Sequence, residues 1–130
     1  MDPTRKQRYL EAVDLLVRGR AVDAVASLRA LFDEDSDEIP ELRLALGKAY
    51  LEAGDPERAR DCFEQILAGP QVSPPAYVAL LAAAASAAAR DPARALHWLS
   101  RTAVHDPRFE HATRALKRRI EDGRPPLIRF

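Results

Sequence analysis

The side chains that could carry out chemistry are few in this sequence of 130 residues, and they are widely spaced. His97, His105 and His111 fall on three segments, without the i, i+4 spacing that places two metal ligands on one helix face. Cys62 is the only cysteine, and it stands in a helical pattern that suits a small buried residue. No nucleophile motif and no glycine-rich phosphate loop occurs. We therefore predict a protein that is not an enzyme, with no catalytic residues, no metal site, no cofactor and no small-molecule substrate.

The acidic run at residues 33–38 is the one stretch that shares a feature with calcium-binding loops. Asp33, Asp35 and Asp37 alternate along it, as the ligands of such loops do. The run lacks the central glycine and the late bidentate glutamate that a calcium loop needs. A solvated loop between two helices is therefore the prediction for this segment.

Composition and charge favour an all-helical protein. Alanine has the highest helix propensity, and the chain holds 24 alanines, whereas aromatic residues make up only 6%. The 20 Lys and Arg side chains cancel the 20 Asp and Glu side chains, which disfavours a polybasic surface for nucleic acid or membranes. The least polar stretch, residues 78–89, is too short to cross a bilayer, and the N-terminal residues do not resemble a secretory signal. We expect a cytoplasmic protein that binds neither nucleic acid nor membrane.

The ten prolines fall between helical patterns, and several of them mark where helices begin. Four of them follow an aspartate, in the pairs Asp2-Pro3, Asp55-Pro56, Asp91-Pro92 and Asp106-Pro107. Aspartate at the N-cap accepts hydrogen bonds from free backbone N–H groups, and proline at the first helical position lacks only an N–H that would have no partner. Glycines stand where the helices should end, at positions 19, 54, 69 and 123. These signals predict seven helices, over residues 3–18, 21–33, 40–53, 56–68, 74–89, 92–104 and 107–121.

The predicted helices repeat in pairs. Three equivalent turns, at Gly19, Gly54 and Arg90, lie 35 and 36 residues apart. Five residues after each turn stands an alanine, and four residues later a large apolar residue: Ala24 and Leu28, Ala59 and Phe63, Ala95 and Leu99. The alanine allows the second helix of a pair to approach the first closely, and the large residue fills the space between pairs. A repeat of this length built from helix-turn-helix units predicts a helical solenoid.

The middle pair resembles the tetratricopeptide repeat family. It follows the family pattern at Leu46-Gly47, Tyr50, Gly54-Asp55, Ala59 and Phe63, whereas no pair has the early tryptophan of the family. The resemblance covers about residues 4–107 and implies an all-α, right-handed superhelical solenoid. The single domain would span residues 1–123, with repeats at about 4–37, 40–72 and 74–107, a capping helix at 107–121 and an extended tail at 124–130.

The seventh predicted helix has two faces. An apolar stripe with spacing 3, 4 and 4 is expected to close the end of the third pair, at Phe109, Ala112, Leu116 and Ile120. The basic side chains are expected to face solvent, at Arg114, Lys117, Arg118 and Arg119. A terminal helix with a polar outer face keeps a solenoid soluble.

The resemblance also implies a binding site for a partner protein. In this family the first helix of each pair lines a concave groove that binds peptides or helices. The matching positions here are Tyr9, Val13 and Leu16 in the first pair, Leu44, Lys48 and Leu51 in the second, and Tyr77, Leu80 and Ala84 in the third. We therefore expect an adaptor or chaperone that binds an amphipathic or extended segment of a partner. The alternative is that the curvature of the solenoid itself buries Leu44, Leu80 and their neighbours.

Two further features keep other functions open. The tail carries Leu127, Ile128 and Phe130, which could dock in an apolar groove of the same chain or of a second copy. Residues 1–65 hold 10 basic and 15 acidic side chains, whereas residues 66–130 hold 10 basic and 5 acidic ones. A structural homo-oligomer assembled through the tail and this charge polarity is one alternative to the adaptor. The other is an accessory protein that touches nucleic acid or a membrane surface with its basic C-terminal helix.

Overall fold

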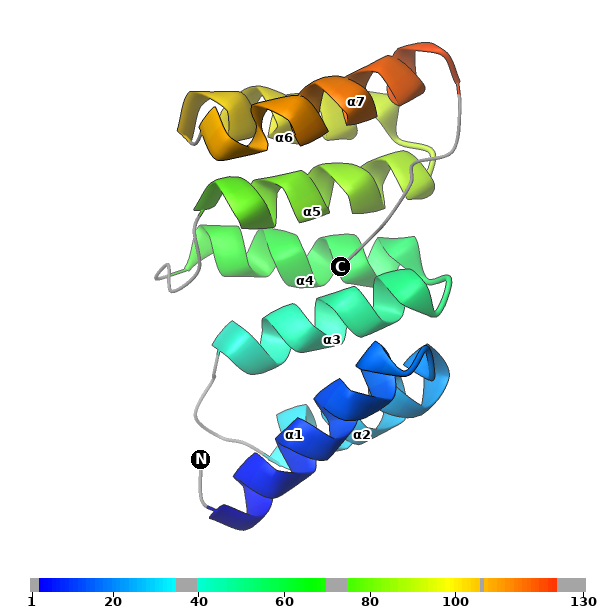
Figure 1. Ribbon diagram of the computed structural model, residues 1–130, viewed down its shortest axis with the longest axis vertical. Helices are drawn as coiled ribbons and strands as arrows, with labels where there is room; N and C mark the ends of the chain where they lie inside the picture. Colours follow the sequence, from blue (N-terminus) through cyan, green and yellow to red (C-terminus); the bar gives the residue numbers. More distant parts are fainter. Residues whose placement is uncertain (1–2, 35–39, 70–74, 106, 124–130) are drawn as a thin grey trace.

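The computed structural model describes residues 3–34, 40–69, 75–105 and 107–123. Within these residues the chain forms seven α-helices, one short 3-10 turn and no strand. In chain order the elements are α1 (Pro3–Val17), α2 (Ala21–Glu34), α3 (Pro40–Glu52), α4 (Pro56–Ala68), α5 (Pro75–Ala88), α6 (Pro92–His105), η1 (Pro107–Phe109) and α7 (Glu110–Glu121) (Figure 1). The all-α fold is confirmed, and the predicted bounds of the first six helices are each correct to within one residue.

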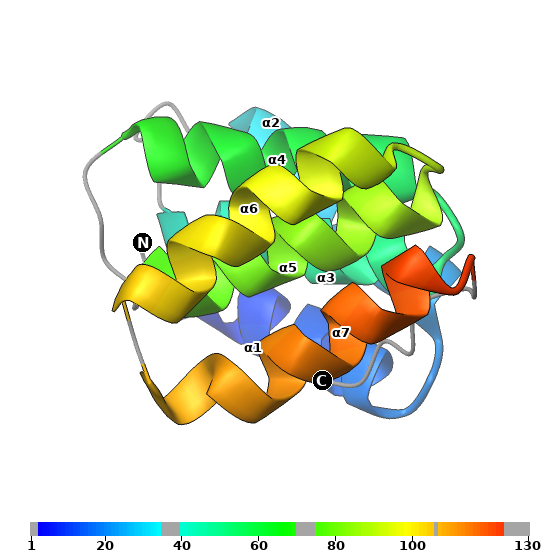
Figure 2. The same ribbon diagram turned by 90° about the horizontal axis from the view of Figure 1, so that it is seen from above.

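The helices stack in antiparallel pairs along the long axis of the molecule (Figure 1). The first helices of the pairs, α1, α3 and α5, lie in one layer, and the second helices, α2, α4 and α6, lie in the other (Figure 2). Each first helix packs against the second helix of its own pair and of the preceding pair, so that α3 contacts both α2 and α4. Helix α7 packs against α6 and α5 and lies on the side of the first helices.

The three turns within the pairs have the same backbone geometry. Gly19, Gly54 and Arg90 all have positive φ, at 78°, 88° and 62°. The N–H group of the residue after each turn donates to a carbonyl oxygen five residues earlier, at 2.9 Å in all three turns. This hydrogen bond and the left-handed residue together close the C-terminus of each first helix. The equivalence of the turns that the sequence predicted is therefore confirmed, including the unusual use of arginine in the third.

Aspartate caps start the second helices of the last two pairs. A side-chain oxygen of Asp55 accepts a hydrogen bond from the backbone N–H of Arg58 at 3.3 Å, and Asp91 accepts from Arg94 at 3.2 Å. Proline follows each of these aspartates at the first helical position, as the sequence predicted. Asp2 and Asp106, the other two predicted caps, lie outside the described residues.

The alternation of small and large residues builds the core. Ala24, Ala59 and Ala95 are fully buried, and so are the large residues that follow them. Gly47 on α3 shows why one position must be small, because a Cβ atom there would lie 2.6 Å from Cε1 of Phe63 on α4. Real Cβ atoms do not approach other atoms so closely, and the two helices of the middle pair would have to move apart.

The last helix differs from its prediction in where it begins and at one position of its inward stripe, whereas Leu116 and Ile120 face inward as predicted. Residues 107–109 form a 3-10 turn, and α7 begins only at Glu110. As a result Ala112 is exposed, and the neighbouring Thr113 is buried instead. The Thr113 hydroxyl donates to the carbonyl oxygen of Phe109 at 2.8 Å, which satisfies this buried polar group. The inward stripe of α7 is therefore Thr113, Leu116 and Ile120; of the four basic residues, Arg119 is half-buried and the others are exposed.

Candidate partner-binding face

The nine predicted binding residues lie on the layer of first helices. Three belong to each of α1, α3 and α5, at the spacing that places them on one stripe of their helix. We call this set the first-helix face: Tyr9, Val13, Leu16, Leu44, Lys48, Leu51, Tyr77, Leu80 and Ala84. Helices α1 and α7 lie on the same side of α3 and α5, at opposite ends of the stack (Figures 1 and 2).

An aromatic and cationic cluster joins three elements on this face. The ammonium nitrogen Nζ of Lys48 on α3 lies 4.9 Å from the centre of the Tyr77 ring on α5. The Tyr77 ring in turn lies 5.9 Å from the ring of Phe109 in η1, at an interplanar angle of 31°. Both contacts are within the range of cation–π and aromatic pairs. Phe109 was expected to serve only the capping helix, and its contact with Tyr77 depends on the 3-10 turn, which no sequence pattern predicted.

Helices α1 and α3 also contact each other, and the charge of Glu41 on α3 influences Tyr9 on α1. Burial raises the pKa of the Tyr9 phenol, and the nearby carboxylate of Glu41 raises it further because it disfavours a second negative charge. The Tyr9 phenol is protonated at neutral pH even at its ordinary pKa of 10.0, so it can donate a hydrogen bond, and the raised pKa extends this ability to higher pH. Tyr9 on α1, Lys48 on α3 and Tyr77 on α5 thus give the face polar groups on all three first helices.

The nine residues are not equally available to a partner. Leu51 and Ala84 are only 5% and 8% exposed, so for these two the alternative of burial within the protein itself applies. Leu80 is half-buried and packs against a cluster that contains Ala84 and also Leu116 of α7. The other six are half-buried: Tyr9, Val13, Leu16, Leu44, Lys48 and Tyr77. These six and Leu80 leave part of their surface to solvent and form the accessible part of the face.

Among the described residues, His, Cys, Asp and Glu side chains form no group of three or more that could hold a metal ion. His97 and His111 are exposed, on α6 and α7. Cys62 on α4 is half-buried, whereas the sequence predicted a buried residue. Its partial removal from water is the main reason why the pKa of its thiol is raised to about 11. The sulfur is thus protonated at neutral pH and is not an activated nucleophile. His105, most of the acidic run and the tail residues Leu127, Ile128 and Phe130 lie outside what the structure describes at side-chain level.

Comparison with known proteins identifies the repeat. A sequence model described as tetratricopeptide repeat matches residues 15–84, from the end of α1 to the middle of α5. No curated protein and no solved structure matches the chain. Within the described residues, no helix is long and apolar enough to span a membrane.

Proposed function

This chain belongs to the tetratricopeptide repeat family, and we propose that it is an adaptor or chaperone that binds a segment of a partner protein on the first-helix face. Repeats of this family generally mediate protein–protein interactions. The family is typically a scaffold without enzymatic activity, and the side-chain chemistry described above offers no competing role.

The observation that carries the proposal is the cluster of Lys48, Tyr77 and Phe109. Aromatic side chains provide a large contact area at a low entropic cost and are enriched where proteins bind one another. Here two aromatic rings and an ammonium group are held by contacts between α3, α5 and η1, so the cluster is already ordered before a partner arrives. Half-buried apolar side chains on α1 and α3 extend the surface beyond it.

The composition of the face indicates the kind of segment that fits. Apolar groups at Val13, Leu16 and Leu44 favour leucine or phenylalanine anchors, repeated along an amphipathic helix or an extended strand. The ammonium group of Lys48 favours a carboxylate near such an anchor. A segment with both features would lie across the three first helices.

The test is a double substitution, Lys48→Glu with Tyr77→Ala. It removes the ring at the centre of the cluster and reverses the charge beside it, and it leaves Leu80 and its contact with α7 intact. We expect affinity capture from the native host, quantified by mass spectrometry, to lose specific partners at least about tenfold, because central aromatic residues dominate binding energy. Arg118→Glu, an exposed charge reversal on α7, is the matched control.

Circular dichroism must show the same helix content for the variant and the wild type. Equal capture by the double variant and the wild type would show that partners bind elsewhere. Loss of capture by the Arg118→Glu control as well would show that net charge, rather than this face, governs the interaction.

A further inference from the structure

In the layer of second helices, polar side chains close the contact between the second and third pairs. Trp98 on α6 donates a hydrogen bond from its indole Nε1 to Oε2 of Glu64 on α4, at 2.8 Å. The same carboxylate oxygen lies 3.0 Å from Nε of Arg94, also on α6. One carboxylate on α4 thus joins a guanidinium and an indole from the next helix of the same layer. Glu64 is only 20% exposed, so the contact is largely covered.

The contact between the first and second pairs has different residues at the equivalent positions. The repeat spacing of 35 and 36 residues relates Glu64 to Arg29 on α2, Arg94 to Arg58 on α4, and Trp98 to Cys62 on α4. The carboxylate is therefore replaced by a second guanidinium, and the large indole by a small thiol. No side chain at these three positions can form the contact that the next pair forms.

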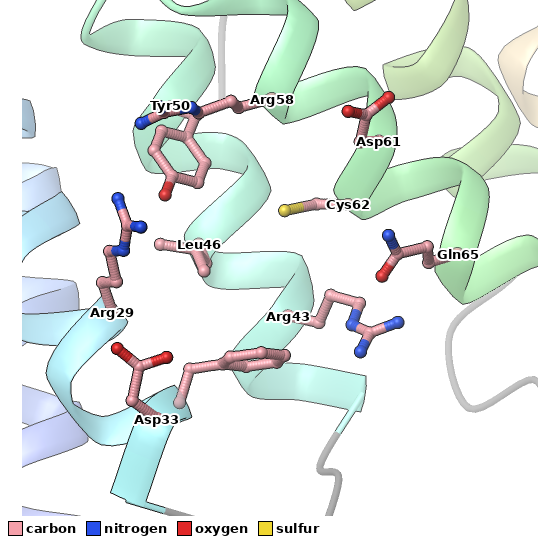
Figure 3. A pocket seen from close by; sticks show the side chains of 10 residues that line it. Arg29, Asp33, Arg43, Leu46, Tyr50, Arg58, Asp61, Cys62 and Gln65 are labelled. Carbon is pink, nitrogen blue, oxygen red and sulfur yellow. The ribbon is translucent and has the colours of Figure 1, made fainter.

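A cleft of about 320 Å³ occupies this place, between α2 and α4 with α3 as its floor (Figure 3). Arg29 lies on the α2 side, Arg58 and Cys62 on the α4 side, and Leu46 and Tyr50 on the floor. The cleft therefore combines three guanidinium groups, those of Arg29, Arg43 and Arg58, and the carboxylates of Asp33 and Asp61 with an apolar and aromatic floor. Burial raises the pKa of the Cys62 thiol and keeps it neutral, so the three arginines of the described lining are opposed only by its two carboxylates, and this lining keeps a net positive charge.

Among the described residues, neither Asp33 nor Asp61 forms an ion pair with Arg29. Its guanidinium points toward Tyr50, away from the carboxylate of Asp33 (Figure 3), and among the described residues it forms no salt bridge. Asp61 on the opposite side of the cleft faces Arg60, at 3.7 Å. Arg58 contacts Asp55 at 3.4 Å and remains 59% exposed, so its guanidinium retains N–H groups that can bind a ligand.

We propose that this cleft is a second binding site, which accepts a carboxylate side chain of a partner protein next to an aromatic side chain. The carboxylate would lie between Arg29 and Arg58, as that of Glu64 lies beside Arg94, and the aromatic ring would fill the space over Cys62 that Trp98 fills in the next contact. One repeat further along, the chain itself fills the equivalent place with such a pair, the carboxylate of Glu64 and the indole of Trp98. Guanidinium groups bind carboxylates with directed, charge-assisted hydrogen bonds. The site lies on α2 and α4, in the layer opposite to the first-helix face, and does not depend on the function proposed for that face.

The test uses the full chain and a fluorescently labelled peptide of glycine and serine with one central Glu-Trp pair. Binding is followed by fluorescence anisotropy at low salt, where exposed charges are least screened. Peptides with Gln-Trp and with Glu-Ala in place of Glu-Trp measure the carboxylate and the ring separately. We expect each of them to bind at least about fivefold more weakly than the Glu-Trp peptide.

The protein variant that tests the site is Arg29→Glu, which places a carboxylate where the other contact has Glu64. We expect it to pair with Arg58 and to weaken binding of the Glu-Trp peptide at least about fivefold, while helix content is kept. Arg118→Glu makes the same change of charge on α7 and should leave the affinity within about twofold.

Any of four results would overturn the proposal. The first three are no binding of the Glu-Trp peptide by wild-type protein at about 1 mM, equal binding by the Arg29→Glu variant, and equal binding of the Gln-Trp or the Glu-Ala peptide; the fourth concerns the first-helix face. The double variant Lys48→Glu and Tyr77→Ala distinguishes the two sites. If it alone abolishes peptide binding, the peptide occupies the first-helix face and the cleft is not the site.

Discussion

The two contacts between successive helix pairs have one backbone arrangement and two different chemistries on their outer layer. Between α4 and α6, Glu64 joins Arg94 and Trp98 in a largely covered polar contact. Between α2 and α4, the equivalent positions hold Arg29, Arg58 and Cys62, and a cleft remains. A repeat protein therefore needs the same small and large core residues in every pair, whereas the rim of each contact is free to close or to stay open for a ligand.

The floor of each contact shows which part of this difference is compensated. Tyr50 on α3 is buried below the cleft, and the equivalent position on α5 holds Ser86, which is also buried. The Ser86 hydroxyl donates to the carbonyl oxygen of Ala82 at 2.8 Å, so it needs no partner from another helix. Bulk thus lies on the first helix in one contact and, as Trp98, on the second helix in the other. The charge of Glu64 is not moved to another helix in this way, because the equivalent position of the open contact holds Arg29.

The largest effect is expected from opening the closed contact with Trp98→Ala. This change removes the ring and leaves Glu64 with one partner fewer, so we expect a loss of about 2 kcal/mol in the free energy of unfolding, less than for a fully buried tryptophan. The matched change Cys62→Ala, at the equivalent position, should cost less than about 1 kcal/mol. Urea denaturation followed by circular dichroism measures both, and similar losses would mean that the two contacts are energetically alike.

The reactivity of Cys62 tests how far water enters the open contact. Because burial raises the thiol pKa to about 11, the reactive thiolate is scarce below that pH. We expect a thiol-specific reagent at pH 8 to modify the folded protein at least about tenfold more slowly than the urea-unfolded chain.

The raised pKa of Cys62 also predicts the direction in which the stability of the protein changes with pH. The folded pKa lies above the ordinary value of 9.0, so the unfolded state loses its proton first, and stability falls as the pH rises from about 9 through about 11. Cys62→Ser should reduce this fall in a series of denaturation curves. In the reactivity experiment, a modification rate of the folded protein equal to that of the urea-unfolded chain would contradict the prediction and show that the thiol is solvated.

The smallest effect concerns the turn that leads into α6. Arg90 has φ of 62°, in the left-handed region that glycine occupies at the two equivalent turns. We expect Arg90→Gly to raise the free energy of unfolding by about 0.5 kcal/mol, because glycine adopts this conformation without a Cβ clash. Gly54→Arg, the reverse change in the middle pair, should lower it by about 1 kcal/mol. Thermal unfolding of both variants measures the difference, and a loss of stability in Arg90→Gly would show that the arginine side chain has a compensating contact.

The sequence predicted the helices, the turns and the pairing of the helices well because these follow from local chemistry. Asp-Pro pairs, glycines after helices and the spacing of Ala59 and Phe63 each act within a few residues or across one helix pair. The positions of the first-helix face also follow from helical spacing once the repeat register is known. The inward residues Leu116 and Ile120 of α7 were predicted correctly, but its first turn was not, because a 3-10 turn of three residues precedes the helix and Thr113 is buried where Ala112 was expected.

The availability of the candidate binding residues was likewise beyond the sequence. Leu51 and Ala84 occupy the repeat positions that Leu16 and Lys48 hold in the preceding pairs, and only the packing of the helices decides that Leu51 and Ala84 are buried while the other two are half-buried. Cys62 was expected inside the core, but the side chains across the contact leave it half-buried at the edge of a cleft.

By itself the sequence determined an all-helical chain of repeated pairs, since propensity, capping and periodic apolar residues act locally and agree with one another. Only the tertiary structure decided which surfaces remain open. Glu64 and Trp98 are 34 residues apart, and whether they meet depends on how α4 and α6 pack on α5. The same packing brings Arg29 and Arg58 to one cleft, and no pattern along the chain predicts that the two side chains line the same cleft.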